Sequence, residues 1–262
     1  MTLDFTLAKY AQLCRAITQL NRPVMTVEQF LRAGCPHQPL IVLRHDVDRA
    51  PAAALRMAQL EARLGMRASY YFRTTRAVFK APIIARLHRL GHEVGYHYEV
   101  LVRAGGNPTR AIEQFAAELA RFRRLAPVHT ISMHGSPLSR WNNLDLWQTH
   151  RFERFDLLGD ATLSIDYRNL YYFTDTGRSW APGPFNLRDR PPARQPERPI
   201  HATDDLIRFL TAPPACPVII SAHPNRWAAG WPGWVAGAAA DWAVNRLKWI
   251  AAQTRRAGAN AA

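Results

Sequence analysis

The chain has 262 residues, 48% of them hydrophobic, and a formal net charge of +14, which suits one domain with a large core. Only three of the 34 basic residues are lysine, the arginines are scattered, and no zinc-finger, helix-turn-helix or RNA-binding signature occurs, so we predict no nucleic-acid partner. No apolar run approaches the roughly 20 residues of a membrane span, and we expect no transmembrane segment.

Helical patterns alternate with short apolar runs along the chain. Helices are predicted where amphipathic spacing lies between start and stop residues, over 5–20, 51–64, 82–90, 108–125, 203–210 and 237–254. Strands are predicted over 40–48 and in three later runs that end at His97, His134 and His223. The alternation predicts an α/β fold with mainly parallel strands, in one domain over residues 1–255 with a core at 40–227 and a frayed tail at 256–262.

The strand predicted over 40–48 ends in ionisable residues. Its apolar start is rich in β-branched residues and predicts a buried strand, and Asp46 and Asp48 lie at its carboxyl end. In an extended chain these two side chains point the same way, whereas His45 and Val47 point the opposite way. Two close like charges either share a proton or need a cation. A divalent metal ion held by one carboxylate would leave the other free as a base. The alternative is a solvated acidic loop.

Three later strands each end in a histidine, at His97, His134 and His223. Imidazole is a common metal ligand and suits zinc-like ions together with carboxylate oxygen. In α/β barrels the residues at the carboxyl ends of the strands meet at a single site. We therefore expect the histidines and the two aspartates to lie close together.

Three segments together resemble the motifs of the polysaccharide deacetylase family of carbohydrate esterases. They are Asp46–Asp48, Gly91–His97 and Ser221–His223, which follow one another in the family's order within residues 40–227. The resemblance implies a distorted (β/α) barrel of mainly parallel strands and a carbohydrate substrate.

The resemblance also implies a role for each matching residue. Asp46 is expected to be the catalytic base, and His223 the general acid that protonates the leaving amine. Asp48 and His97 are expected to bind one divalent metal ion, with zinc as the preferred ion.

One position departs from the family pattern. The family places a second metal-binding histidine four residues after the first, and Leu101 occupies that position here. His134 or Glu99 could replace it. We favour His134, because two histidines and one carboxylate leave open positions for water and substrate, as catalytic zinc requires. A third possibility is that the metal site is lost and the protein only binds glycans.

The segment between residues 176 and 199 is dense in proline, arginine and glycine and predicts a long irregular loop. This loop either covers the site as a lid or lies on the protein surface without a role in the site. Asp175, Arg178 and Trp180 stand at its start, where the family often has substrate-proximal residues, and we predict that these three bind substrate. Further along the chain, the spacing of Trp242 and Trp249 predicts core packing on a helix.

Cysteine usage and the first residues predict the compartment. Cys14, Cys35 and Cys216 form no CxxC pair and cannot all pair with one another, so we expect reduced thiols. The first residues lack a basic region followed by an apolar stretch, which indicates no signal peptide. We therefore expect a cytoplasmic protein.

The sequence as a whole predicts a metal-dependent hydrolase that removes an acetyl group from an N-acetylated sugar or a sugar-containing precursor, in surface-polysaccharide biosynthesis. Two alternatives stay open. One is a hydrolase of another non-peptide C–N bond on the same scaffold, because a fold does not fix a substrate. The other is a non-catalytic glycan-binding protein with a decayed site.

Overall fold

The strand predicted over 40–48 lies at the centre of a parallel sheet. The structure, a computed structural model, describes residues 3–181, 188, 190–212, 214–243 and 246. Within these residues the sheet has eight strands, all paired in parallel, in the order β6-β5-β4-β3-β2-β8-β7, and β1 pairs with the start of β2. The strands are Val24–Met25 (β1), Ile41–Val47 (β2), Ser69–Phe72 (β3), Glu93–Tyr98 (β4), Thr130–Met133 (β5), Gly159–Asp160 (β6), Tyr171–Thr174 (β7) and Val218–Ala222 (β8).

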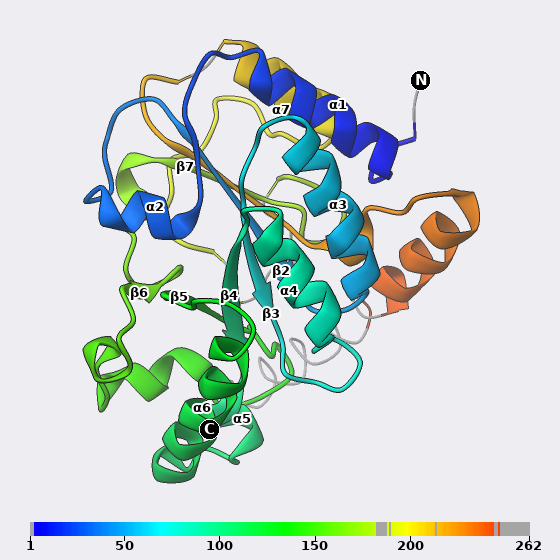
Figure 1. Cartoon of the computed structure of the whole chain (residues 1–262). Helices are drawn as coiled ribbons and strands as arrows, with labels where there is room; N and C mark the ends of the chain where they lie inside the picture. The colour runs from blue at the N-terminus through cyan, green and yellow to red at the C-terminus, as the bar shows by residue number, and fades with distance from the viewer. Residues whose placement is uncertain (1–2, 182–187, 189, 213, 244–245, 247–262) are drawn as a thin grey trace, which may run out of the picture.

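Helices connect most of the strands. Those with both ends in the described residues are Leu7–Thr18 (α1), Val27–Arg32 (α2), Pro51–Arg63 (α3), Ala81–Arg89 (α4), Val100–Arg103 (α5), Pro108–Arg123 (α6) and Thr203–Thr211 (α7). Short 3-10 helices cover Asn143–Gln148 (η1), Phe152–Phe155 (η2), Tyr167–Asn169 (η3) and Pro224–Arg226 (η4). Helix α3 contacts both α1 and α4, and the three lie along one side of the sheet in Figure 1.

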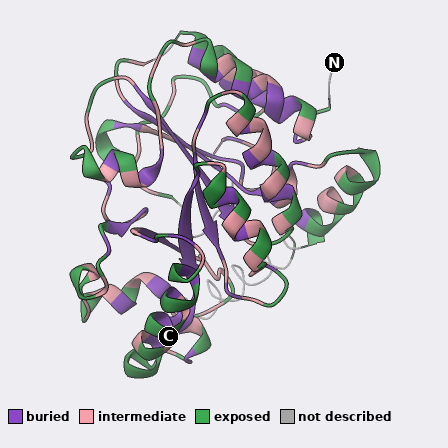
Figure 2. Cartoon of the chain, in the orientation of Figure 1, coloured by how far each residue is buried: buried purple, intermediate pink, exposed green. Residues whose placement is uncertain are grey.

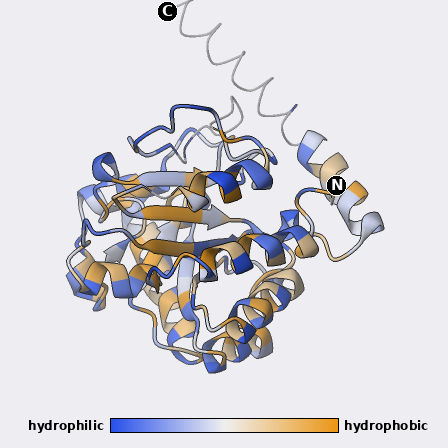
Figure 3. Ribbon diagram, turned by 90° about the horizontal axis from the view of Figure 1, so that it is seen from above, coloured by the Kyte–Doolittle hydropathy of each residue, from blue (hydrophilic) through white to orange (hydrophobic). Residues whose placement is uncertain are grey.

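Strand β2 is buried on both faces. Its residues Ile41, Leu43 and Val47 belong to the larger core cluster, whereas Val42 and the preceding Leu40 belong to a second cluster. The burial of both faces explains why the run is apolar without interruption instead of alternating with polar residues. Figure 2 shows the strands buried at the centre and the helices with exposed outer faces, and Figure 3 shows the apolar residues concentrated on the strands.

The predicted fold class is confirmed. The strands are parallel and alternate with helices, and the sheet curls into a half-barrel whose edge strands β6 and β7 do not pair with each other in the described residues. The helix ranges match closely where the sequence carries clear end signals. Helix α6, for example, begins at Pro108 after Asn107, whose side chain accepts a hydrogen bond from the Arg110 amide.

Four strands were not among the predicted ones, namely β1, β3, β6 and β7. They are two to four residues long, and β3 and β7 consist mainly of aromatic residues. Runs this short show too few alternations to be recognised from periodicity alone. The described residues between 176 and 199 form no helix or strand element, as expected for a loop.

The expected core packing of Trp242 is wrong. The helix near the end of the chain begins at residue 231 instead of 237, and its described part runs to residue 243. Trp242 is 64% exposed on it, because this helix lies outside the sheet and its neighbouring helices. Trp249 and the predicted tail 256–262 lie outside the described residues.

In the described part of the chain, no helix combines the length and the apolar character needed to cross a bilayer. Cys14, Cys35 and Cys216 are all free thiols, as expected.

Gly95 in β4 offers a test of the packing inside the sheet. A Cβ atom at this position would lie 2.2 Å from Cδ1 of Tyr71 in β3 and 3.1 Å from the Thr130 carbonyl oxygen, so only glycine fits. We expect Gly95→Ala to lower the free energy of unfolding by about 1–3 kcal/mol, the usual cost of overpacking. Chemical denaturation measures it. Gly230→Ala is the control, because its new Cβ would find its nearest neighbour at 4.0 Å. Equal stability of the two variants would contradict the expected close contact.

Candidate active site

Five predicted site residues lie at the carboxyl ends of four strands. Asp46 is in β2 and Asp48 follows it, His97 is in β4, and His134 and His223 directly follow β5 and β8. Parallel strands present these ends at the same edge of the sheet, and the structure brings the five side chains together there.

Asp48 is the point on which two imidazoles converge. Its Oδ1 atom lies 3.3 Å from Nε2 of His97 and 3.6 Å from Nε2 of His134. The two imidazole rings stand almost perpendicular, with centroids 5.4 Å apart. Oδ1 is buried and receives no hydrogen bond. Burial opposes the charge of Asp48, but His134 and then His97 outweigh it and hold its pKa well below the ordinary value.

The outer nitrogens of both imidazoles determine which atoms face Asp48. Nδ1 of His97 lies 3.0 Å from the carbonyl oxygen of Ser132, which can only accept, so Nδ1 carries the proton. Nδ1 of His134 lies 3.0 Å from the carboxylate of Glu99, which also accepts. In their neutral forms both rings therefore present an Nε2 lone pair towards a carboxylate oxygen. Three acceptors at one point repel one another unless a cation lies among them.

Among the described residues, no group of three or more His, Cys, Asp or Glu side chains is arranged so that it could hold a metal ion. The donor set nonetheless fits a divalent ion, because it combines two imidazole nitrogens with one carboxylate oxygen that lacks any other partner. Protons can take the place of the cation, and the pKa of His97 is accordingly raised: burial lowers it, but Asp46 and then Asp48 outweigh burial.

Glu99 is held by other side chains. Besides facing His134, its two oxygens accept hydrogen bonds of 2.7 and 2.9 Å from the Arg73 guanidinium. Burial raises the pKa of Glu99, but His134 and then Arg73 outweigh it and lower the value to about 2. Glu99 thus orients His134, as carboxylates commonly do for histidines that bind metal ions.

Asp46 has its own cationic partner. The Arg44 guanidinium, on the same face of β2, donates to both carboxylate oxygens at 2.7 and 3.0 Å and to the Ser132 hydroxyl at 2.7 Å. Burial raises the pKa of Asp46, but Arg44, then His97 and His223, outweigh it and lower the value. Asp46 is therefore ionised at neutral pH and able to accept a proton.

His223 is fixed by Asp175. Nδ1 of His223 donates to Oδ1 of Asp175 at 2.6 Å, and the His223 amide donates to Oδ2 at 2.9 Å. Arg226 donates to Oδ1 at 2.7 Å and the Trp227 indole to Oδ2 at 2.9 Å, so each oxygen accepts two hydrogen bonds. This arrangement sets the tautomer of His223 and leaves Nε2 as the atom that can exchange a proton.

The prediction that Asp175 and Trp180 bind substrate disagrees with the structure. Asp175 is fully buried and Trp180 is 2% exposed, so neither can touch a substrate. Trp180 packs against Phe5 in the core and donates to the Thr203 hydroxyl. The substrate role of Arg178 stays a prediction, and its Nε atom donates to Asp241 at 2.9 Å. Proximity to the site along the chain did not give Asp175 and Trp180 access to it.

Several residues that complete the site were not singled out from the sequence: Arg44, Arg73, Ser132 and Arg226. Arg44 could have been found, because it precedes Asp46 by two residues and a strand places both on one face. The other three are far from their partners along the chain and carry no local signal.

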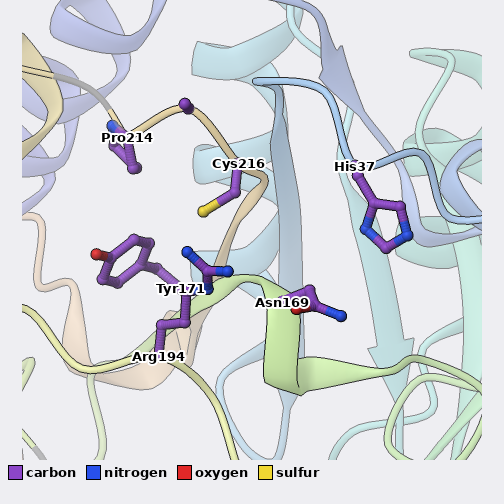
Figure 4. A pocket seen from close by; sticks show the side chains of 7 residues that line it. His37, Asn169, Tyr171, Arg194, Pro214 and Cys216 are labelled. Atoms are coloured by element: carbon purple, nitrogen blue, oxygen red, sulfur yellow. The ribbon is translucent and has the colours of Figure 1, made fainter.

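The site is distinct from the pocket in Figure 4. That cavity of about 590 Å³ is lined by His37, Asn169, Tyr171, Arg194, Pro214, Ala215 and Cys216. Tyr171 begins β7 and Cys216 shortly precedes β8, so this pocket lies at the amino ends of the strands, opposite the five site residues.

No protein-family model matches the chain, and no curated protein matches it. Among solved structures, the chain is similar to a family 4 carbohydrate esterase from Bacillus anthracis, with 11% identity and a TM-score of 0.41 over 80% of this chain and 77% of the other. At this level of similarity the neighbour's function does not transfer to this chain, and the residues of the site carry the functional argument.

Asp175 provides a test of the electrostatics. Burial raises its pKa, but Arg226 and then His223 outweigh burial and lower it from 3.8 to about 2. A carboxyl group with a lower pKa in the folded state stabilises the fold above its unfolded pKa, and the stabilisation is lost as the pH falls through the folded pKa. We expect Asp175→Asn to lower the free energy of unfolding by about 2 kcal/mol at neutral pH.

The stability difference between Asp175→Asn and the unmodified protein should shrink as the pH falls from about 4 towards 2. Urea denaturation at a series of pH values measures it. A difference that does not change with pH would show that the Asp175 charge contributes nothing and that only its hydrogen-bonding shape matters.

Proposed function

We propose that the protein is a metal-dependent hydrolase that removes an acetyl group from an N-acetylated sugar or a sugar-containing precursor. Asp48, His97 and His134 would hold one divalent ion, with zinc preferred. Asp46 would act as the base and His223 as the acid. The observation that carries the proposal is the convergence of one carboxylate oxygen of Asp48 and the Nε2 atoms of His97 and His134. This cluster lies beside the Asp46 carboxylate, which Arg44 holds, and the His223 imidazole, whose Nδ1 atom Asp175 holds.

The metal ion, when bound, supplies Lewis acidity that polarises the acetyl carbonyl. The remaining steps belong to the protein. Asp46 takes the proton of the attacking water, and Arg44 keeps its carboxylate ionised and oriented. His223 gives a proton from Nε2 to the leaving amine, and Asp175 holds the ring in place through its Nδ1 hydrogen bond.

An amide is the bond that best suits this acid. An amine is a poor leaving group until it is protonated, so amide hydrolysis needs a general acid opposite the base. That this amide belongs to a carbohydrate is implied by the sequence resemblance alone. The cytoplasmic location and the role in surface-polysaccharide biosynthesis stay predictions from the sequence.

Metal content tests the ligand set. We expect the purified protein to bind about one zinc ion per chain, and Asp48→Ala to lose it while the fold stays intact. Asp166→Ala is the matched control, because the exposed Asp166 side chain contacts Arg168, through an ion pair and the Arg168 amide, and lies away from the proposed ligands. Elemental analysis and isothermal titration with Zn²⁺ measure both. Full occupancy in Asp48→Ala would remove Asp48 from the site.

The same titration ranks the two candidates for the third ligand. We expect His134→Ala to weaken zinc binding far more than Glu99→Gln, since Glu99 contacts the outer nitrogen of His134 and Arg73. Loss of a residue that orients a ligand costs about 10- to 100-fold in metal affinity. The reverse ranking would make Glu99 the ligand. No zinc binding by the unmodified protein would favour a glycan-binding protein with a decayed site.

Activity measurements test the acid and the base. Acetate and amine release should be screened over N-acetylated monosaccharides, oligosaccharides and nucleotide sugars. With the best substrate, we expect Asp46→Asn to keep its zinc and to lose ~10²- to 10⁴-fold in turnover, and His223→Ala to lose a similar factor. The alkaline limb of the pH–rate profile should disappear in His223→Ala. An unchanged rate and limb would show that His223 is structural.

A further inference from the structure

A helical segment near the end of the chain is fastened to the candidate active site. It covers residues 231–243 and is the orange helix in Figure 1, seen from above in Figure 3. Three of its residues touch Arg178 or the start of the chain. The Trp234 indole donates to the Asp4 carbonyl oxygen and its ring lies under the Arg178 guanidinium. Gly237 leaves room for Arg178, because a Cβ there would lie 2.6 Å from Nη2.

Asp241 of this segment is the counter-charge for two half-buried arginines, Arg178 and Arg226. Its Oδ2 atom lies 2.9 Å from Nε of Arg178 and 3.9 Å from Nε of Arg226, and the residue is only 8% exposed. In the described residues the only other carboxylate that pairs with either arginine is Asp175, which pairs with Arg226. Nη1 and Nη2 of Arg178 and Nε of Arg226 have no hydrogen-bond partner there. Burial lowers the pKa of Arg226, but Asp175 and then Asp241 outweigh it and raise it.

These contacts form a continuous chain of charges that ends at the proposed acid. Asp241 faces Arg226, Arg226 donates to Oδ1 of Asp175, and the same oxygen accepts the Nδ1 proton of His223. Arg226 thus lies between two carboxylates, one that fixes His223 and one that belongs to a peripheral helix.

We propose that Asp241 is a positioning residue for His223, acting through Arg226 and Asp175 from the helical segment 231–243. The proposal deepens the proposed function and rests on it for its catalytic meaning. It makes the geometry of the acid depend on the docking of this segment.

The physical reason is the balance of charges on Arg226. With Asp241 present, Arg226 lies between two carboxylates and Arg178 has one. Without it, Arg178 loses its paired carboxylate and Arg226 pairs with Asp175 alone, and a largely buried charge without compensation is unfavourable. Arg226 must then draw Oδ1 of Asp175 towards itself or move out of its site. Either movement weakens the hydrogen bond between Asp175 and His223.

The Nδ1 proton of His223 reports this hydrogen bond without any substrate. A proton shared between atoms 2.6 Å apart gives a proton NMR signal far downfield of the amide region. In the full-length protein with ¹⁵N-labelled histidine, the signal is assigned by its loss in His223→Ala. We expect it to move upfield or to broaden away in Asp241→Asn, and to be kept in Asp241→Glu.

A control and a second variant of the segment complete this arm of the test. Asp204→Asn removes the carboxylate of another ion pair, 2.8 Å from Lys9, and should leave the signal in place. Trp234→Leu loosens the segment without changing its charge, and we expect it to weaken the signal too, because the acid depends on the docking of the segment. An unchanged signal in Asp241→Asn, or an equal loss in Asp204→Asn, would overturn the proposal.

A variant of Arg226 keeps the test decisive should Asp241→Asn fail to fold. Arg226→Lys retains a positive charge, but its single nitrogen cannot both donate to Asp175, as Nη1 does, and lie near Asp241, as Nε does. We expect it to lose the signal as well, and an unchanged signal would overturn the proposal.

Turnover provides the catalytic arm of the test. With the best substrate from the screen, we expect Asp241→Asn to lose about 10- to 100-fold in kcat with little change in KM, and Asp241→Glu to restore most of it. An unchanged kcat in a variant that has lost the signal would overturn the catalytic part. Absence of turnover in the unmodified protein would count against the proposed function, while the NMR signal would still decide the role of Asp241.

Discussion

Two carboxylates at the end of one buried strand must both stay ionised. Asp46 lies in β2 and Asp48 directly follows the strand, and burial opposes the charge of both carboxylates. The structure places a different balancing group against each. Arg44 pairs with Asp46, and the imidazoles of His97 and His134 face Asp48, where protons on the rings or a bound cation would balance its charge.

The opposite face of the same strand carries a second buried polar group. His45 points away from Asp46 and lies 2.7 Å from Oε1 of Glu61 in α3, whose other oxygen accepts from the Tyr70 hydroxyl. Burial raises the pKa of Glu61, but His45 and then His92 outweigh it and lower the value. All four side chains are buried. The end of β2 is therefore held by hydrogen bonds on both faces, which fixes Asp46 more rigidly than apolar packing alone would.

The proposed base and acid are held in different ways. Asp46 is held within the sheet by a neighbour on its own strand. His223 is held by Asp175, and Asp175 depends on Arg226 and through it on a helix that lies outside the sheet. A rigid base and an acid tied to a peripheral element would let the docking of that element change turnover without disturbing the sheet.

The sequence by itself determined the central strand, the parallel α/β fold and the residues at the strand ends. These follow from the hydrophobic periodicity, the order of helices and strands along the chain, and the residues that begin and end helices, all of which can be read locally. It also favoured His134 over Glu99 for the vacancy at Leu101, because two histidines and one carboxylate suit a catalytic zinc ion. The tertiary structure adds that Glu99 contacts Arg73 and the outer nitrogen of His134. Likewise the buried positions of Asp175 and Trp180 and the contact of Asp241 with Arg226 join residues more than ten positions apart along the chain. Such contacts depend on how the segments pack in space, which periodicity and spacing do not encode.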